Sequence, residues 1–146
     1  ILYNGVERTD KDKKIRLLCS RIFDIMEIKN WELSVVVCDD NFIRELNRNY
    51  KGKDAPTDVL SFPQAGFDFK NSRNKKHYAG DIIISVESLA KNSGEFNVDI
   101  NEEFSRLLIH GILHLKGYIH EDNSPQQDML KLQEDLIKML PGEKIF

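Results

Sequence analysis

Three of the chain's four histidines lie within one short segment, between His110 and His120. His110 and His114 are four residues apart, so on a helix both imidazoles lie on one face, within reach of a single ion. Gly117 follows three residues later and can take the left-handed backbone conformation that ends a helix. The chain can then turn back and bring His120 to the same ion. We therefore predict that His110, His114 and His120 are metal ligands.

The ligand type limits the metal and suggests its role. Neutral imidazoles suit zinc and similar divalent transition metals. Three protein ligands with no obvious fourth leave a coordination position open for water, which is typical of catalytic rather than structural sites. The pattern predicts one Zn²⁺ per chain, although three histidines also accept nickel, copper or iron. A purely structural ion is the alternative.

The same spacing indicates which chemistry is absent. His-x-x-x-His-x-x-Gly-x-x-His is the spacing of the metzincin proteases, in which a glutamate directly after the first histidine is the general base. That position is Gly111 in this chain. Glycine cannot accept a proton, so the spacing favours a metal-dependent hydrolase and counts against peptide hydrolysis.

The composition is that of a globular protein with no strong charge. The 146 residues predict a single domain, 1–146, with 40% hydrophobic and 31% charged residues. The formal net charge of −3 provides no overall basic field, so any RNA binding must come from a local patch. No apolar run would span a bilayer and no secretion signal is visible, which favours a cytoplasmic protein. Cys19 and Cys38 are expected to be buried, reduced thiols.

Hydrophobic patterning places these motifs on alternating strands and helices. Val35, Val36 and Val37 are contiguous and β-branched, which predicts a strand covered on both faces. Asp99 can cap the helix that carries His110 and His114. Strands are expected at 1–7, 31–38, 59–62 and 80–84, the third as an edge strand stopped by Pro63. Helices are expected at 10–28, 40–50 and 86–91, from Asp99 to the histidine turn, and from residue 126 to 140.

These elements predict an α+β fold with a small sheet of about four strands and about five helices. The metal site would lie on a C-terminal helix and the turn after it.

Residues 64–78 are polar, rich in lysine and arginine and without periodicity, so we expect a loop there with His77 exposed to solvent.

Three segments together resemble one known family. They are the histidine segment His110-Gly-Ile-Leu-His-Leu-Lys-Gly-Tyr-Ile-His120, the segment Tyr50-Lys-Gly-Lys-Asp-Ala-Pro-Thr-Asp-Val-Leu-Ser-Phe-Pro63, and Gly80-Asp-Ile82. They are similar to the YbeY family of bacterial rRNA-maturation endoribonucleases, and the resemblance covers almost the full length. It implies a mixed four-stranded sheet with surrounding helices, a metal held by three histidines, and cleavage of single-stranded RNA.

The resemblance also implies a biological setting. It predicts a part in 16S rRNA 3′-end maturation and in ribosome quality control, with single-stranded rRNA and the ribosome or 30S subunit as partners. A cytoplasmic location, no membrane and a monomeric state are expected.

The sequence departs from the family pattern at two positions. Lys51 stands where the family usually has an arginine thought to matter for activity; lysine keeps the charge but loses the planar fork that suits phosphate. Ile119 stands where aspartate is common. We predict that Lys51 and His114 are catalytic, and that Arg48, Lys51 and Lys53 contact RNA.

Two mechanisms and two other functions stay open at the level of sequence. A metal ion could activate water as the nucleophile, or polarise a phosphoryl oxygen so that an RNA 2′-hydroxyl attacks. In either case Lys51 is our candidate for stabilising the negative charge that develops. The other functions are hydrolysis of a non-RNA substrate and a ribosome-associated binding factor with a structural metal. Asp81 could orient a histidine ring or cap backbone, and we favour a structural role for it, as for Asp58 and Ser61.

Overall fold

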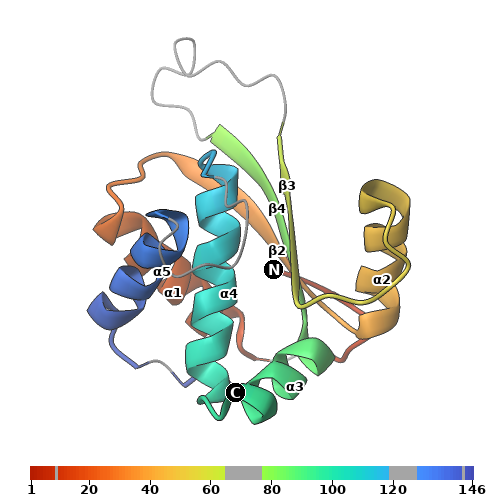
Figure 1. Cartoon of the computed structure of the whole chain (residues 1–146). Coiled ribbons are helices and arrows are strands. Elements are labelled where there is room, and N and C mark those ends of the chain that lie inside the picture. The colour runs from red at the N-terminus through yellow and green to blue at the C-terminus, as the bar shows by residue number, and fades with distance from the viewer. Residues whose placement is uncertain (9, 65–76, 119–127, 143) are drawn as a thin grey trace.

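The computed structural model describes residues 1–8, 10–64, 77–118, 128–142 and 144–146. Within these ranges the chain forms four strands and five helices (Figure 1). In chain order they are β1 (Leu2–Asn4), α1 (Asp12–Ile25), β2 (Trp31–Cys38), α2 (Asp40–Lys51), β3 (Val59–Pro63), β4 (His77–Ser85), α3 (Val86–Phe96), α4 (Ile100–Leu115) and α5 (Asp128–Met139).

The four strands form one mixed sheet in the order β1-β2-β4-β3. β1 pairs with β2 and β2 pairs with β4, both in parallel, whereas β3 pairs antiparallel with β4. β3 is therefore an edge strand, as its terminal proline predicted. The predicted α+β class, with four strands and five helices, is confirmed.

Helices cover both faces of the sheet. α1, α4 and α5 lie on one face and α2 on the other, with α3 at one end of the sheet (Figure 1). The larger core lies on the first face and includes Val35 and Val37 of β2. A smaller core lies under α2, where Ile43 packs near Val36. The β-branched run of β2 is thus covered on both faces, as predicted.

One expectation about the polar segment was wrong. We expected a loop through residue 78 with His77 exposed, but β4 begins at His77 and this side chain is buried. The register explains the burial, because His77 pairs with Trp31 at the start of β2 and the two rings meet edge to face, 6.0 Å between centroids. Burial lowers the pKa of the His77 imidazole. Residues 65–76 of the segment lie outside the described residues.

Two smaller features complete the fold. Cys19 and Cys38 are both buried free thiols, as expected. Within the described ranges, none of the helices has the length and apolar character needed to cross a bilayer.

Candidate functional site

Helix α4 carries the two histidines that the spacing singled out. The Asp99 carboxylate accepts hydrogen bonds from the backbone N–H groups of Asn101 and Glu102, at 2.9 and 3.3 Å, so the predicted N-cap is present. These bonds hold the pKa of Asp99 below its ordinary value. The middle of the helix is fully buried between the sheet and the other helices, with Leu108 and Ile112 both at 0% exposure. Burial on both sides fixes the helix rigidly, which a metal or catalytic site requires.

His110 and His114 lie together on one face of α4. Their ring centroids are 4.6 Å apart and their Nε2 atoms are 3.0 Å apart. The i, i+4 spacing therefore produces the pairing expected of it. The Nδ1 atom of His110 lies 2.8 Å from the side-chain carbonyl oxygen of Gln133, on the neighbouring helix α5.

The histidine pair fits a divalent metal in donor type and spacing. Two nitrogens bound to one tetrahedral zinc at about 2.05 Å would lie about 3.3 Å apart. The observed Nε2–Nε2 separation is 3.0 Å, so a small opening of the pair would accommodate the ion. Without a metal, the same separation allows one imidazole N–H to donate to the other ring.

The helix ends as the sequence predicted. Gly117 has a φ of +97°, in the left-handed region. Its N–H donates to the carbonyl of His114, and the Tyr118 N–H donates to the carbonyl of Leu113, both at 3.0 Å. These bonds close the last turn of α4. His120, our third predicted ligand, lies outside the described residues, and the residues that the structure does describe contain no group of three metal-binding side chains.

Lys51 shares a pocket with His110 and His114. The pocket has a volume of about 470 Å³ and lies between the edge strand β3 and the end of α4. Its lining consists of Lys51, Val59, Leu60, Ser61, Pro63, His110, His114, Gly117 and Tyr118. The structure therefore brings a cation from residues 50–63 together with two histidines some sixty positions later in the sequence.

Contacts from α2 fix the turn that follows Lys51. Lys51 is the last residue of α2, and Gly52 ends the helix with a left-handed φ of +73°. The buried Asn47 side chain donates to the carbonyl of Ala55 at 2.9 Å, and Arg44 bonds Asp54 at 2.8 Å. Both contacts hold the following loop against α2, so that Lys51 stays at the edge of the sheet.

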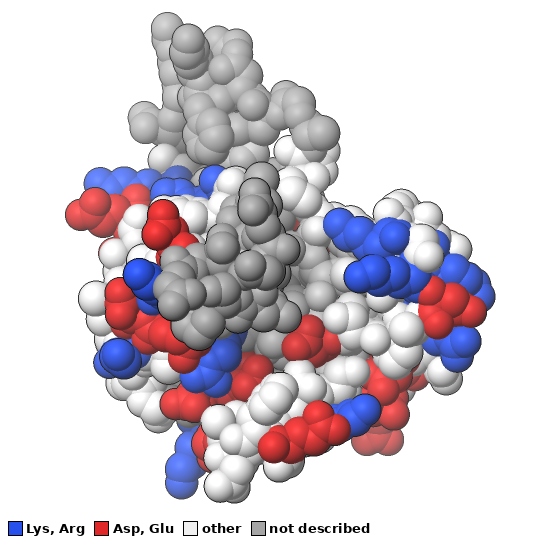
Figure 2. All heavy atoms as spheres, in the orientation of Figure 1, with Lys and Arg blue, Asp and Glu red and all other residues white. Residues whose placement is uncertain are grey.

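Arg48 and Lys53 occupy a different position from Lys51. Both are exposed and neither lines the histidine pocket. Figure 2 shows Lys and Arg side chains gathered over α2, on the right of the view. Of the three predicted RNA contacts, Lys51 alone reaches the pocket, while Arg48 and Lys53 belong to the surface beside it.

Some pocket residues were missed by sequence reasoning. Ser61 was expected to be structural, but it lines the pocket, as does Tyr118, to which we gave no role. Strand alternation could have indicated Ser61: Leu60 and Phe62 pack on the α2 side, so the residue between them faces α4. Gln133, which contacts His110 but does not line the pocket, was also missed. A polar residue within the apolar stripe of a helix is a signal for a buried polar contact.

Two acidic residues have structural contacts. The Asp58 carboxylate accepts hydrogen bonds from the Val59 N–H at 2.8 Å and the Asn92 side chain at 2.9 Å, which ties the start of β3 to α3. The Asp81 carboxylate accepts a hydrogen bond from the Tyr78 hydroxyl. Asp81 lines the hollow under α2, on the face of the sheet opposite the histidines.

Known proteins resemble this chain in sequence and in fold. A 47% identical protein from Treponema denticola, named Endoribonuclease YbeY, matches over 91% of this chain and 86% of its own length. Proteins of the same name from Treponema pallidum and Borreliella burgdorferi are 53% and 45% identical, each over 80% of this chain, and over 72% and 79% of their own lengths.

A solved structure supports the fold independently. The solution structure of a Thermotoga maritima protein, 29% identical, matches with a TM-score of 0.62 over 94% of this chain and 86% of its own. The family model described as Endoribonuclease YbeY matches residues 4–141. That match takes in the histidine pair, the pocket and all the secondary structure except the first residues of β1. The chain therefore belongs to the YbeY family.

Proposed function

We propose that this protein is a metal-dependent endoribonuclease that cleaves single-stranded RNA. The observation that carries the proposal is the pocket that joins His110 and His114 to Lys51, in a chain whose family is named for this activity. We further propose that the substrate is precursor 16S rRNA near its 3′ end, on the ribosome or 30S subunit. A role in ribosome quality control, in the cytoplasm and as a monomer, follows from the same family resemblance.

His110, His114 and His120 would hold the metal, and zinc is the proposed ion. Bound there, a divalent cation supplies Lewis-acid chemistry, which activates water or polarises a phosphoryl oxygen. Lys51 lines the same pocket as the histidines, and its ammonium group would stabilise negative charge on the phosphoryl oxygens during cleavage. Its position allows it to replace the arginine common in the family, as a point charge rather than a bidentate fork.

The polar groups of the pocket would orient the phosphodiester. The Ser61 hydroxyl comes from β3 and the Tyr118 side chain from the turn after α4, so they approach the pocket from two elements. Both can donate a hydrogen bond to a phosphate oxygen. Fixing the phosphate relative to the histidines would lower the entropic part of the activation free energy of cleavage.

The surface beside Lys51 would bind the unpaired bases next to the cleavage site. Lys51 Nζ lies 5.9 Å from the Phe62 ring centroid. The Tyr50 ring meets Phe62 edge to face at 5.4 Å, and Tyr50 is 69% exposed. An exposed aromatic beside a cation is typical of sites where single-stranded bases stack. Bases in a duplex are already stacked on one another, so such a surface favours single strands.

Arg48 and Lys53 would contact the RNA backbone outside the pocket. Arg48 is in the last turn of α2 and Lys53 is in the turn after it. Figure 2 shows Lys and Arg side chains gathered over α2. Phosphate contacts of this kind add affinity that depends on salt but carries no sequence information. A local basic surface of this kind allows RNA binding despite the net charge of −3.

Chelation and metal return test the proposal. Purified protein of measured zinc content is incubated with a single-stranded rRNA fragment and with a duplex of the same sequence. We expect cleavage of the single strand alone, loss of cleavage after EDTA, and recovery when zinc is added back. His114→Ala, purified in parallel, controls for contaminating nucleases.

The same experiment separates the alternative functions. A ribosome-associated factor with a structural metal would unfold more easily after EDTA, and would bind but not cut RNA. Removal of a catalytic ion should lower the free energy of unfolding only by the contribution of metal binding itself and leave the protein folded, because α4 is held in the core by its own apolar residues. Equal cleavage by wild type and His114→Ala would contradict the nuclease assignment.

A further inference from the structure

Gln133 of α5 is a buried polar residue that contacts a predicted metal ligand. Its exposed fraction is only 7%. The other buried residues on that side of the helix are apolar. Its side-chain Oε1 lies 2.8 Å from Nδ1 of His110, which comes from α4. Burying an amide costs free energy unless its polar atoms are paired. The contact therefore accounts for the presence of a glutamine within the helix–helix interface.

A second hydrogen bond fixes which way the Gln133 amide faces. Its Nε2 donates to Oε2 of Glu134 at 3.2 Å. A flipped amide would turn its carbonyl oxygen toward the Glu134 carboxylate, where two acceptors would repel. The observed orientation leaves Oε1 facing His110, and only an N–H can bond to a carbonyl oxygen. His110 must then carry its proton on Nδ1.

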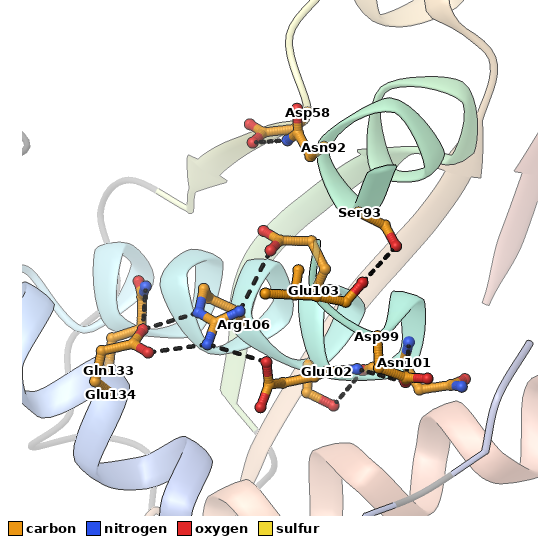
Figure 3. A network of polar contacts seen from close by, with 12 residues as sticks. Asp58, Asn92, Ser93, Asp99, Asn101, Glu102, Glu103, Arg106, Gln133 and Glu134 are labelled. Carbon is orange, nitrogen blue, oxygen red and sulfur yellow. Dashed lines mark hydrogen bonds and ion pairs between the residues drawn. The ribbon is translucent and has the colours of Figure 1, made fainter. Parts of the chain in front are cut away.

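Arg106 holds Glu134 in place. Its Nε and Nη2 atoms donate to the two carboxylate oxygens of Glu134, each at 2.9 Å, and its Nη1 donates to Glu103 at 3.3 Å (Figure 3). These bonds from Arg106 lower the pKa of Glu134, so the carboxylate stays charged and accepts from Gln133 at neutral pH. A bidentate arginine–carboxylate pair is geometrically specific. The network thus connects Arg106 through Glu134 and Gln133 to His110.

The proton on Nδ1 decides what His110 offers to the pocket. A neutral imidazole protonated at Nδ1 has its lone pair on Nε2. That Nε2 is the atom 3.0 Å from Nε2 of His114. The hydrogen bond at Nδ1 also restricts rotation of the His110 ring, because it ties the ring on α4 to a side chain on the neighbouring helix α5.

We propose that Gln133 is a positioning residue that fixes His110 in the Nδ1–H tautomer, with Nε2 directed to the metal. The proposal rests on the metal site of the proposed function. Partners of this kind, beyond the ligands themselves, typically change metal affinity by about 10-fold to 100-fold when removed. The neutral amide supplies the acceptor without placing another negative charge beside Glu134.

Two variants separate the hydrogen bond from packing. Gln133→Met keeps a side chain of similar length in the interface but removes the acceptor, whereas Gln133→Glu keeps an acceptor. The probe is zinc alone, and affinity is measured by competition with a chromophoric chelator. We expect Gln133→Met to bind zinc about 10-fold to 100-fold more weakly than wild type. Gln133→Glu should bind zinc more tightly than Gln133→Met, because it keeps the acceptor even though it adds a negative charge beside Glu134. Unfolding curves check that both variants fold.

A spectroscopic measurement tests the tautomer without any variant of Gln133. In metal-free protein labelled with ¹⁵N at histidine, long-range ¹H–¹⁵N spectra report which ring nitrogen is protonated, and His110→Ala assigns the signal. We expect Nδ1–H for wild-type His110 and an increased Nε2–H population in Gln133→Met. An Nε2–H tautomer in the wild type would overturn the proposal even if Gln133→Met did not fold.

Failure of this proposal differs from failure of the proposed function. If Gln133→Met folds and keeps both the wild-type tautomer and the wild-type zinc affinity, Gln133 has no positioning role, while wild-type zinc binding and RNA cleavage still stand. If the wild-type protein binds no zinc, the proposed function and the role of Gln133 are both overturned.

Discussion

Ile82 of β4 lies directly against Gly111 of α4. A Cβ atom built on Gly111 would come within 2.8 Å of the Ile82 Cγ2 atom, closer than side chains approach in proteins. The residue after the first histidine therefore faces the sheet, and glycine allows the helix to pack closely on it. The position that holds the general base in metzincins is here a site of contact between helix and sheet, which gives a structural reason for the missing glutamate.

This contact predicts how two glycine substitutions differ. Gly111→Ala should lower the free energy of unfolding by about 1–2 kcal/mol, because overpacking against Ile82 outweighs the gain in helix propensity. Gly94→Ala in α3 is the matched control, since nothing lies within 4 Å of a Cβ added there. It should raise the free energy of unfolding by about 0.5–1 kcal/mol. Urea denaturation measures both, and a stabilising Gly111→Ala would show that the helix can move away from the sheet.

Much of the histidine helix could be predicted from local sequence. The i, i+4 spacing gave the pairing of His110 and His114, and Gly117 and Asp99 marked the ends of α4 correctly because these signals act within one helical turn. The contiguous valines of β2 likewise indicated a strand covered on both faces, since β-branched residues favour strands wherever they pack.

Contacts between distant segments could not be predicted in the same way. Nothing local indicates that Gln133 would meet His110, because that contact depends on how α5 packs against α4. His77 became buried through its register with Trp31, which the polar residues before it gave no reason to expect. A catalytic role for Lys51 was expected from the family resemblance alone, and the structure adds that Lys51 lines the same pocket as the histidines.

Lys51 should matter for turnover more than for folding. Lys51→Ala should lower the cleavage rate by about 100-fold, because the pocket loses its cation near the developing negative charge. Lys51→Arg should retain most activity, since it keeps the charge and matches the residue common in the family. Single-turnover cleavage of a single-stranded fragment measures the effect. Lys91→Ala, on the exposed surface of α3, is the control, and an equal loss in that variant would indicate a general charge effect.

Tyr50 should contribute to binding single-stranded RNA. Tyr50→Ala should weaken binding of a single-stranded oligonucleotide by about 10-fold, because one base would lose its stacking partner. The side chain is 69% exposed, so the fold should not change. Phe96→Ala removes a similarly exposed aromatic, 65% accessible, that lines neither hollow beside β3, and it should bind RNA like wild type. Fluorescence anisotropy measures the affinities. Equal binding by both variants would show that Tyr50 does not contribute to RNA binding.

The two cysteines should be inert in the folded protein. Burial raises the pKa of both thiols to about 12, and Cys19 and Cys38 are 8% and 0% exposed. Because the thiolate is the reactive form, its population at pH 8 is very small. A colourimetric disulfide reagent should therefore detect almost no thiol in native protein and two in guanidinium chloride. Rapid reaction of the native protein at pH 8 would show that one of these sites opens to solvent.

The most direct test of the account compares wild type with His114→Ala for zinc content, folding and RNA cleavage. We expect the variant to keep its fold, because His114 is at the surface end of a helix held by its apolar residues. It should lose zinc and cut a single-stranded rRNA fragment about 1,000-fold more slowly or not at all. A folded His114→Ala protein that retains zinc and cleaves at the wild-type rate would contradict both the ligand assignment and the mechanism.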